Sequence, residues 1–336
     1  MNRLSWILVV ALVSLLLASS LGGCDLSEQP VRQLKFSVVA SIDSSWYKGA
    51  VRFADLVKER SRGKLIITVY PDAQLAGGNQ TKELEMLQEG KIDFTYHSTL
   101  LYMNLDKKFF VLSMPWIFSS YEDVDRVLNG AAGRKLLDLT STYKIVGLAY
   151  GENGFRQLTN SKREIRTPED MKGLRVRVPN APMYLSIFKA LGAEPTIMNF
   201  AAVYKALQED AMDGQENPID VIVSSKLYDV QKYITLWNYS YDALILGVNQ
   251  TLYNSLDKPT QDLLRQAAVE ASTYQIQLSR EAARTKLGLL KEKGMVVTEL
   301  TPEQLQAFRD KMGPIYTEYE PIIGKELLDE VRAASQ

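Results

Sequence analysis

The sequence predicts an α/β protein made of two lobes, and three observations lead to this fold class. Strand and helix patterns alternate along the first half of the chain, and the same kind of strand-to-helix junction occurs twice further on. A run of helix-forming residues near the C-terminus is also too long for one small lobe. With 336 residues, 46% of them hydrophobic, the chain suits two medium domains with ample core.

The first half of the chain has the βα rhythm of an α/β fold. The expected strands and helices are, in order, a strand at 34–40, a helix at 45–60, a strand at 64–70, a helix at 81–89, a strand at 92–96, a helix at 121–139 and a strand at 145–150. The third strand brings His97 and Ser98 to its carboxyl end. Gly151 and Gly154 then bracket a joint that we expect to be flexible.

The first junction is a strand at 174–178 that ends beside a helix N-terminus. Three aliphatic residues alternate with Arg175 and Arg177, so both arginines share one face. Asn180 is a good N-cap and Pro182 suits a first helical turn, so a helix is expected to begin there. A guanidinium and a helix amino end both attract a carboxylate, which makes Arg177 a candidate ligand residue. A surface arginine is the alternative, and it fits Arg175 better.

The second junction, DGQENP at 213–218, repeats this arrangement with Asn217 before Pro218. Asn217 is expected to cap the following helix, to bind a ligand, or to do both.

A short internal echo supports two equivalent lobes. The segment 87–93 shares Leu, Gln, Glu and a final Asp with the segment 207–213. The echo predicts that His97 or Ser98 in one lobe faces Glu216 or Asn217 in the other.

Residues 260–293 predict one long helix, because they contain no proline and a single glycine. These 34 residues would reach about 50 Å at 1.5 Å per residue, so the helix must cross both lobes. A coiled-coil dimerisation helix is the alternative, but regular heptad spacing is lacking. A final helical region begins after Thr301, and Pro314 is expected to break it.

The amino end resembles a secretory signal. An apolar run at 6–17 is too short to be a comfortable membrane span, and small residues follow it up to Cys24. Residues 21–24, LGGC, also resemble the lipobox of bacterial lipoproteins, in which the Cys is diacylated. An ordinary signal peptide with a chance Cys is the alternative. Asp25 after a lipidated Cys would favour retention on the inner membrane.

The composition excludes several function classes. Lysine plus arginine number 39 and aspartate plus glutamate 40, so no basic surface for nucleic acid is expected. A single Cys and a single His exclude an internal disulfide and a Cys/His zinc cluster. No metal or cofactor is therefore expected, and a Ser-His-acid triad would have to use His97.

Seven segments together resemble one known family. They are WYKGAVRFADLV, PDAQLAGG, LQEGKIDFTYHST, GFRQLTN, TPEDMKGLRVRVPNAPMY, FAAVYKALQ and DGQENP. They are similar to the extracytoplasmic solute receptors of tripartite ATP-independent periplasmic (TRAP) transporters, the dicarboxylate-receptor family. The resemblance covers nearly the whole mature chain. It implies a periplasmic-binding-protein fold in which two α/β lobes close on an organic acid and one long helix lies across both.

The resemblance also implies a set of ligand contacts. Arg177 would form the salt bridge to the substrate carboxylate, Asn217 and Asn180 would donate or accept hydrogen bonds, Phe200 would line the pocket, and Arg156 would be a second cationic contact. For Arg156 two roles stay open. It either binds the ligand or forms a hinge ion pair with Glu152 or Glu216.

The rest of the pocket wall is defined less sharply. Sialic-acid members of the family carry Glu and Asn at the positions of Ser98 and Val39, which argues against sialate here. The further candidates are His97, Ser98, Trp46, Asp43, Trp116, Trp237, Tyr239 and Asp242. A neutral His, hydroxyls and aromatic faces suit a hydroxylated acid. Packing is the alternative for each of them, Trp116 above all.

The sequence therefore predicts a receptor without catalysis. It would bind a small organic acid, a sugar acid such as a uronate or else a C4-dicarboxylate, and deliver it to the small and large TRAP membrane subunits for ion-driven import. The expected parts are a signal peptide at 1–23, a lipidated linker at 24–33, lobe I at 34–153 plus 243–282, and lobe II at 154–242 plus 283–336. We expect a periplasmic monomer anchored through Cys24 to the outer face of the inner membrane. A hydrolase or lyase using His97 and a receptor that feeds a sensor kinase are the alternatives.

Overall fold

The computed structural model describes residues 31–335. The expectations for the signal peptide, for Cys24 and Asp25, and for most of the linker lie outside these residues. No helix within 31–335 combines the length and the apolar character that a membrane span requires.

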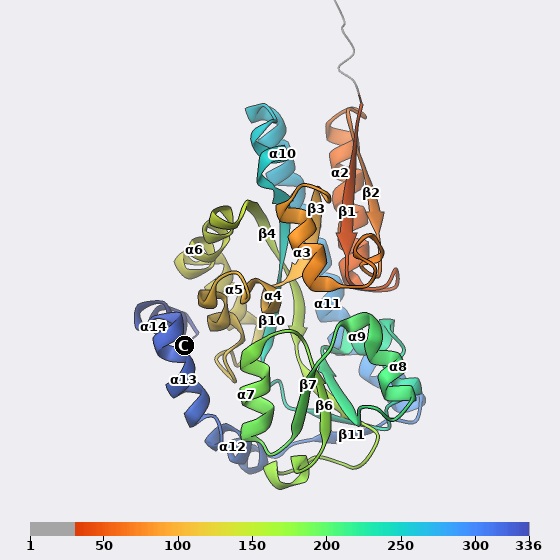
Figure 1. The fold of residues 1–336 in the computed structure, drawn as a ribbon, viewed down its shortest axis with the longest axis vertical. Coiled ribbons are helices and arrows are strands. Elements are labelled where there is room, and N and C mark those ends of the chain that lie inside the picture. The colour runs from red at the N-terminus through yellow and green to blue at the C-terminus, as the bar shows by residue number, and fades with distance from the viewer. Residues whose placement is uncertain (1–30, 336) are drawn as a thin grey trace, which may run out of the picture.

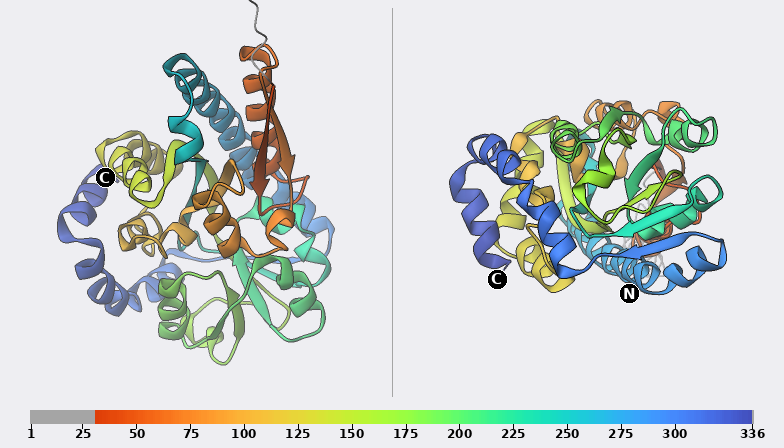
Figure 2. Two further views of the ribbon diagram at one scale, coloured as in Figure 1. Left: turned by 45° about the horizontal axis from the view of Figure 1, so that its top comes forward. Right: turned by 90° about the horizontal axis from the view of Figure 1, so that it is seen from below.

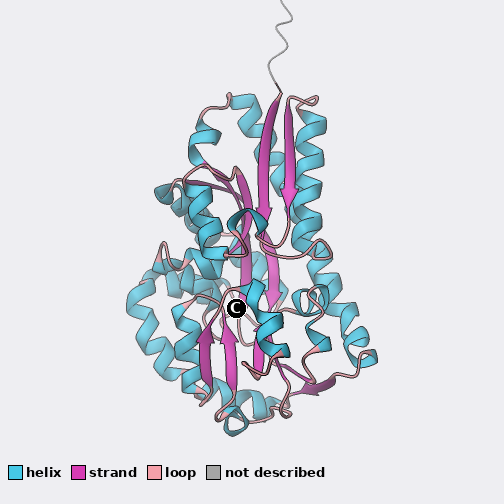
Figure 3. Cartoon of the chain, turned by 45° about the vertical axis from the view of Figure 1, so that its right-hand side comes forward, coloured by secondary structure: helices cyan, strands magenta, loops and turns pink. Residues whose placement is uncertain are grey.

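The described chain forms two separate mixed sheets surrounded by helices (Figures 1 and 3). The first sheet has the order β2-β1-β3-β10-β4. Its strands are β1 (Arg32–Val38), β2 (Leu65–Tyr70), β3 (Phe94–Ser98), β4 (Ile145–Phe155) and β10 (Tyr241–Asn249). Strand β1 is parallel to β2 and β3, whereas β10 runs antiparallel between β3 and β4.

The second sheet has the order β11-β9-β5-β8-β6-β7. Its strands are β5 (Gln157–Asn160), β6 (Arg175–Val178), β7 (Glu194–Ile197), β8 (Gly214–Asn217), β9 (Tyr233–Leu236) and β11 (Val296–Glu299). The two-lobed α/β fold is confirmed. The residue boundaries expected for the lobes stay a prediction.

The helices are mostly where the sequence predicts them. They are α2 (Ser45–Arg60), α3 (Gln80–Gln88), α4 (Thr99–Tyr102), α5 (Tyr121–Asn129), α6 (Ala131–Leu139), α7 (Pro182–Ala190), α8 (Val203–Gln208), α9 (Ile219–Ser224), α10 (Gln250–Asn254), α11 (Lys258–Glu292), α12 (Pro302–Asp310), α13 (Gly313–Ile323) and α14 (Lys325–Ala334). The single helix expected at 121–139 is wrong. Gly130 is extended, with φ −83° and ψ −168°, so α5 ends there and α6 begins.

The long helix α11 is confirmed and has 35 residues. It packs against strand β4 of the first sheet and against α2, which covers that sheet. It also packs against α9 beside the second sheet, so it crosses both lobes. Close packing on β4 explains Gly151: a Cβ there would lie 2.8 Å from Gln275 Oε1 and 3.0 Å from the Tyr96 ring.

The joint between the sheets differs from the expectation. Strand β4 continues through Gly151 and Gly154 as far as Phe155, so these glycines do not interrupt the strand. The chain enters the second sheet after Arg156 and returns to the first sheet between Leu236 and Tyr241. Arg156 therefore lies at the crossing point itself.

The C-terminal helices run along one side of the molecule (Figure 2). Helix α13 packs on α7, and α14 packs on α5 and α6. Pro314 does not break a helix as expected, because it lies in the first turn of α13, where a missing N–H costs nothing. Pro321 is the proline inside that helix.

Candidate functional site

A pocket lies between the two sheets and contains about 470 Å³ of space free of protein atoms, part of it open to solvent. Of the residues predicted to bind a ligand, those that line it are Arg177, Arg156, Asn217, Phe200, Ser98, His97, Asp242 and Trp46. The others that line it are Val39, Ala40, Gln80, Leu100, Leu101, Asn153, Pro179 and Val221. The structure thus brings the predicted set together, with Asn180 as the exception.

The predicted caps at both junctions are wrong. The residue at the cap position of α7 is Ala181, whose amide donates to Pro179 O at 2.7 Å. Asn180 lies one residue before the cap position and therefore does not cap the helix. Asn180 Nδ2 instead donates to Thr81 Oγ1 at 3.3 Å. At the second junction Pro218 takes the cap position of α9, and Asn217 ends β8.

Arg177 is a buried cation that has no acidic partner among the residues that the structure describes. It is 1% exposed near the end of β6, and its Nε and Nη2 both donate to Met198 O, at 2.9 and 2.7 Å. Within residues 31–335 no carboxylate lies within 4.0 Å of the guanidinium. Burial lowers the pKa of Arg177 to about 9, Glu216 opposes this shift, and Arg156 adds to it. The side chain is therefore still charged at neutral pH, facing the pocket beside the Phe200 ring at 5.7 Å.

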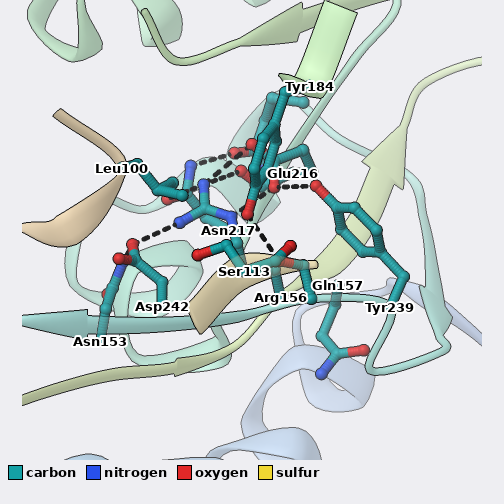
Figure 4. Close-up of polar contacts among 12 residues, drawn as sticks. Leu100, Ser113, Asn153, Arg156, Gln157, Tyr184, Glu216, Asn217, Tyr239 and Asp242 are labelled. Carbon is teal, nitrogen blue, oxygen red and sulfur yellow. Dashed lines mark hydrogen bonds and ion pairs between the residues drawn. The ribbon is translucent and has the colours of Figure 1, made fainter. Parts of the chain in front are cut away.

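Arg156 is the opposite case, because acidic groups surround it (Figure 4). Its Nε donates to Glu216 Oε2, its Nη2 donates to Glu216 Oε1 at 2.8 Å and to Asn217 Oδ1 at 3.1 Å, and its Nη1 donates to Asp242 Oδ2 at 2.8 Å. Burial alone would lower the pKa of Arg156, but the two carboxylates outweigh it and hold the pKa above its ordinary value. Of the two ion pairs left open by the sequence, the one with Glu216 is present. Glu152 pairs with Arg280 instead, at 3.0 Å.

Asp242 joins Arg156 to the wall formed by the first sheet. Ser98 Oγ donates to Asp242 Oδ1 at 2.6 Å. Asn153, which lies beside Asp242 in Figure 4, donates from Nδ2 to Oδ2 at 2.7 Å. Trp46 Nε1 completes the chain by donating to Asn153 Oδ1 at 3.2 Å. Burial raises the pKa of Asp242. Asn153 was not among the predicted site residues, and its only signal in the sequence is its place between Gly151 and Gly154.

His97, which lines the pocket, forms a buried pair with Glu83 behind it. His97 Nε2 donates to Gln80 O at 2.8 Å and lies 3.6 Å from Glu83 Oε2. Burial lowers the pKa of His97 to about 4 and raises the pKa of Glu83 to about 8. At neutral pH both groups are therefore uncharged, and the contact is not an ion pair. Ser37 Oγ donates to the other Glu83 oxygen.

The remaining candidates do not line the pocket. Trp116, Trp237 and Tyr239 pack against one another, and Asp43 is exposed. The Trp237 ring lies 4.7 Å from that of Tyr239 and 6.2 Å from that of Trp116. The prediction drawn from the internal repeat, that His97 or Ser98 faces Glu216 or Asn217, is confirmed in part. His97, Ser98 and Asn217 line one pocket, whereas Glu216 lies behind Arg156.

A polar pocket with basic groups, enclosed between two α/β lobes that a long helix crosses, defines the class of solute-binding receptors. The chain belongs to the bacterial extracellular solute-binding protein family 7, DctP, whose sequence profile matches residues 36–321.

Three relatives show how broad this similarity is. The chain is 32% identical over 298 residues to the C4-dicarboxylate-binding protein DctB of Bacillus subtilis, covering 88% of this chain and 85% of the relative. A TRAP periplasmic solute-binding protein of Ralstonia eutropha H16, solved with bound (S)-2-acetolactate, is 37% identical with a TM-score of 0.88 and coverage of 90% and 98%. The sugar acid binding protein DctPAm of Advenella mimigardefordensis, solved with galactonate, is 33% identical with a TM-score of 0.88 and coverage of 92% and 99%. This chain is thus a TRAP-type receptor and not an enzyme, so the hydrolase or lyase alternative is wrong.

Proposed function

We propose that this receptor captures a small hydroxylated monocarboxylate, such as a sugar acid, by a salt bridge between Arg177 and the ligand carboxylate. The observation that carries the proposal is the guanidinium of Arg177, which is buried in the pocket wall and has no acidic partner within residues 31–335. A buried charge without a partner costs several kcal/mol, and a bound carboxylate would remove that cost by forming paired hydrogen bonds to the planar guanidinium.

The charge distribution favours one carboxylate over two. Arg156 already has Glu216 and Asp242 as partners, which leaves Arg177 as the cation available to a ligand among the described lining residues. A second carboxylate on the ligand would lie near the Asp242 carboxylate, which repels it, and would find no free cation among the described lining residues. C4-dicarboxylates are therefore the second choice as ligands, although the relative from Bacillus subtilis is named a C4-dicarboxylate-binding protein.

The other polar groups suit ligand hydroxyls. Asp242 is an acceptor in the wall, where its Oδ1 already accepts a hydrogen bond from Ser98. Asn217 lies at the end of β8 and adds an amide to the same wall. Hydroxyl groups can donate to these acceptors, whereas a second carboxylate cannot.

In the proposed cycle the lobes, 34–153 plus 243–282 and 154–242 plus 283–336, close around the acid. The closed receptor then docks on the TRAP membrane subunits, which import the acid with an ion gradient. Ligand contacts from both lobes favour the closed state because only there are they made together. We further propose that the receptor acts as a monomer in the periplasm and that lipidated Cys24 tethers it to the inner membrane. Mass spectrometry of the mature amino-terminal peptide, with and without Cys24→Ser, tests the tether.

The central test measures binding of a panel of acids to the full chain carrying Cys24→Ser. Isothermal titration with galactonate, galacturonate, gluconate, malate and succinate is compared for the parent, Arg177→Met and Arg175→Met. Arg175 is the matched control, since it lies on the same strand but bonds to Asp213 outside the pocket. Loss of Arg177 should cost about 3 kcal/mol, roughly a hundredfold in Kd, while Arg175→Met should bind as the parent does. Equal binding by Arg177→Met and the parent would refute the salt bridge, and tighter binding of succinate than of every monocarboxylate would refute the ligand class.

A further inference from the structure

Asp220 makes a polar contact between the two halves of the molecule and does not line the pocket. It lies in α9, three residues after Asn217, and it is 3% exposed. Its Oδ2 accepts a hydrogen bond from the backbone N–H of Ser45 at 2.9 Å. Its Oδ1 accepts one from Lys286 Nζ of α11 at 2.7 Å. A carboxylate beside the second sheet thus binds a helix that packs on the first.

The bond to Ser45 meets a specific need of α2. The first N–H groups of a helix have no partner within the helix, and they carry the positive end of its dipole. The Ser44 side chain accepts from Tyr47 N, which leaves the Ser45 N–H to Asp220. Asp220 is therefore a cap for α2 that the other half of the molecule supplies.

This contact adjoins the pocket directly. Trp46 follows Ser45 and Val221 follows Asp220, and both of these neighbours line the pocket. Ser41 Oγ adds a second bond between the same two regions by donating to Ser224 O at 3.2 Å, and Ser224 is the last residue of α9. Any motion that separates the lobes at the pocket must break the Asp220 bond.

We propose that Asp220 is a closure latch, a positioning residue that stabilises the closed receptor without touching the ligand. The inference rests on the proposed function in one respect, namely that the lobes close around an acid. Losing the latch lowers the population of the closed state, so the apparent affinity falls by the same factor. The expected effect of Asp220→Ala is a roughly tenfold higher Kd, about 1.4 kcal/mol, that arises from faster dissociation.

The chain offers a closely matched control in Asp213. Its Oδ2 accepts from a backbone N–H, that of Arg175 at 2.9 Å, and its Oδ1 pairs with the Arg175 guanidinium at 2.6 Å. Asp213 is 5% exposed, and both of its bonds stay beside the second sheet. Asp213→Ala therefore removes the same chemistry without removing a contact between the lobes.

The experiment combines binding of galactonate with a lobe-to-lobe distance. Spin labels at Glu85→Cys and Lys205→Cys, both exposed positions, are placed on the full chain carrying Cys24→Ser. Distance distributions are recorded with and without galactonate for the parent, Asp220→Ala, Asp220→Asn and Asp213→Ala. Asp220→Asn keeps the shape of the side chain, so it replaces Asp220→Ala if that variant does not fold.

The latch predicts a larger open fraction and faster galactonate release in the Asp220 variants, with the association rate and the Asp213→Ala affinity unchanged. A parental distance distribution and parental Kd in the Asp220 variants would overturn it. So would an equal loss of affinity in Asp213→Ala, which would indicate general destabilisation. If galactonate does not bind even to the parent, the ligand proposal is in question, and the ligand-free distances alone decide whether Asp220 holds the lobes together.

Discussion

The buried carboxyl of Glu83 should make the stability of this receptor fall as the pH rises. Glu83 is fully buried on α3, and burial raises its pKa from 4.5 to about 8, with the Ser37 hydrogen bond opposing the shift. Between these two values the folded chain holds a proton that the unfolded chain has lost. The contribution of Glu83 to the free energy of unfolding is therefore fully present below pH 4.5 and is lost as the pH rises toward 8.

The size of the effect follows from the two pKa values. Each pH unit within the window costs about 1.36 kcal/mol of the free energy of unfolding, and the slope halves as the pH reaches the folded value. From pH 6.5 to 8 the sum is about 1.6 kcal/mol. The neighbouring titratable group, His97 on β3, has a folded pKa of about 4, below its usual 6.5, so its own contribution is lost only below pH 6.5.

Urea unfolding of the parent and Glu83→Gln at pH 6.5, 7.25 and 8 measures this slope. Glutamine places a neutral amide where the protonated carboxyl was, and the amide does not titrate. The free energy of unfolding of Glu83→Gln should therefore fall by about 1.6 kcal/mol less than that of the parent between pH 6.5 and 8. Glu85→Gln is the same substitution on the exposed face of α3 and should keep the parental slope. Parallel pH profiles for Glu83→Gln and the parent would show that Glu83 titrates normally in the folded protein, which would refute the argument.

Two further substitutions test the packing and the charges around the joint. Gly151→Val should lower the free energy of unfolding by about 2 kcal/mol in urea titrations, because its Cβ would collide with Gln275 and Tyr96; a parental midpoint would mean that α11 can move away from β4. Arg280→Met should cost about 3 kcal/mol at pH 8, since it leaves the buried Glu152 carboxylate unpaired. Burial already raises the pKa of Glu152 to about 7, so the loss should shrink at pH 6, where the carboxyl takes up a proton, and a loss that is independent of pH would contradict this account.

The sequence could predict the elements whose signals are local. Alternation gave the strands at 64–70 and 174–178, and amphipathic spacing gave the helix at 45–60, each within two residues of the observed ends. The long helix α11 followed from the absence of proline and from its length. These features depend on the chain within a few residues, where propensity and periodicity act.

Errors arose where tertiary contacts override a local preference. Asn180 has the chemistry of a cap, yet a turn between Pro179 and Ala181 moves the helix start past it. Gly130 divides α5 from α6, although a helical pattern runs through it. The roles of Asn153 and Glu83 could not be predicted from the sequence because they depend on neighbours from other strands and helices, such as Asp242 and His97.

Arg156 and Arg177 show why site residues could be found but not ranked. Arg156 directly follows β4, and Arg177 is the last residue but one of β6. Both are almost fully buried, and both line the same pocket. They differ only in whether carboxylates from distant parts of the chain reach them: Glu216 and Asp242 reach Arg156, and no acidic side chain of the described residues reaches Arg177. A guanidinium that already has two counter-ions gains little from a third anion, whereas an unpaired one gains a whole salt bridge. The specificity for an acid therefore depends on which arginine the fold leaves without a partner, and that depends on the strand order that places β8 and β10 beside Arg156.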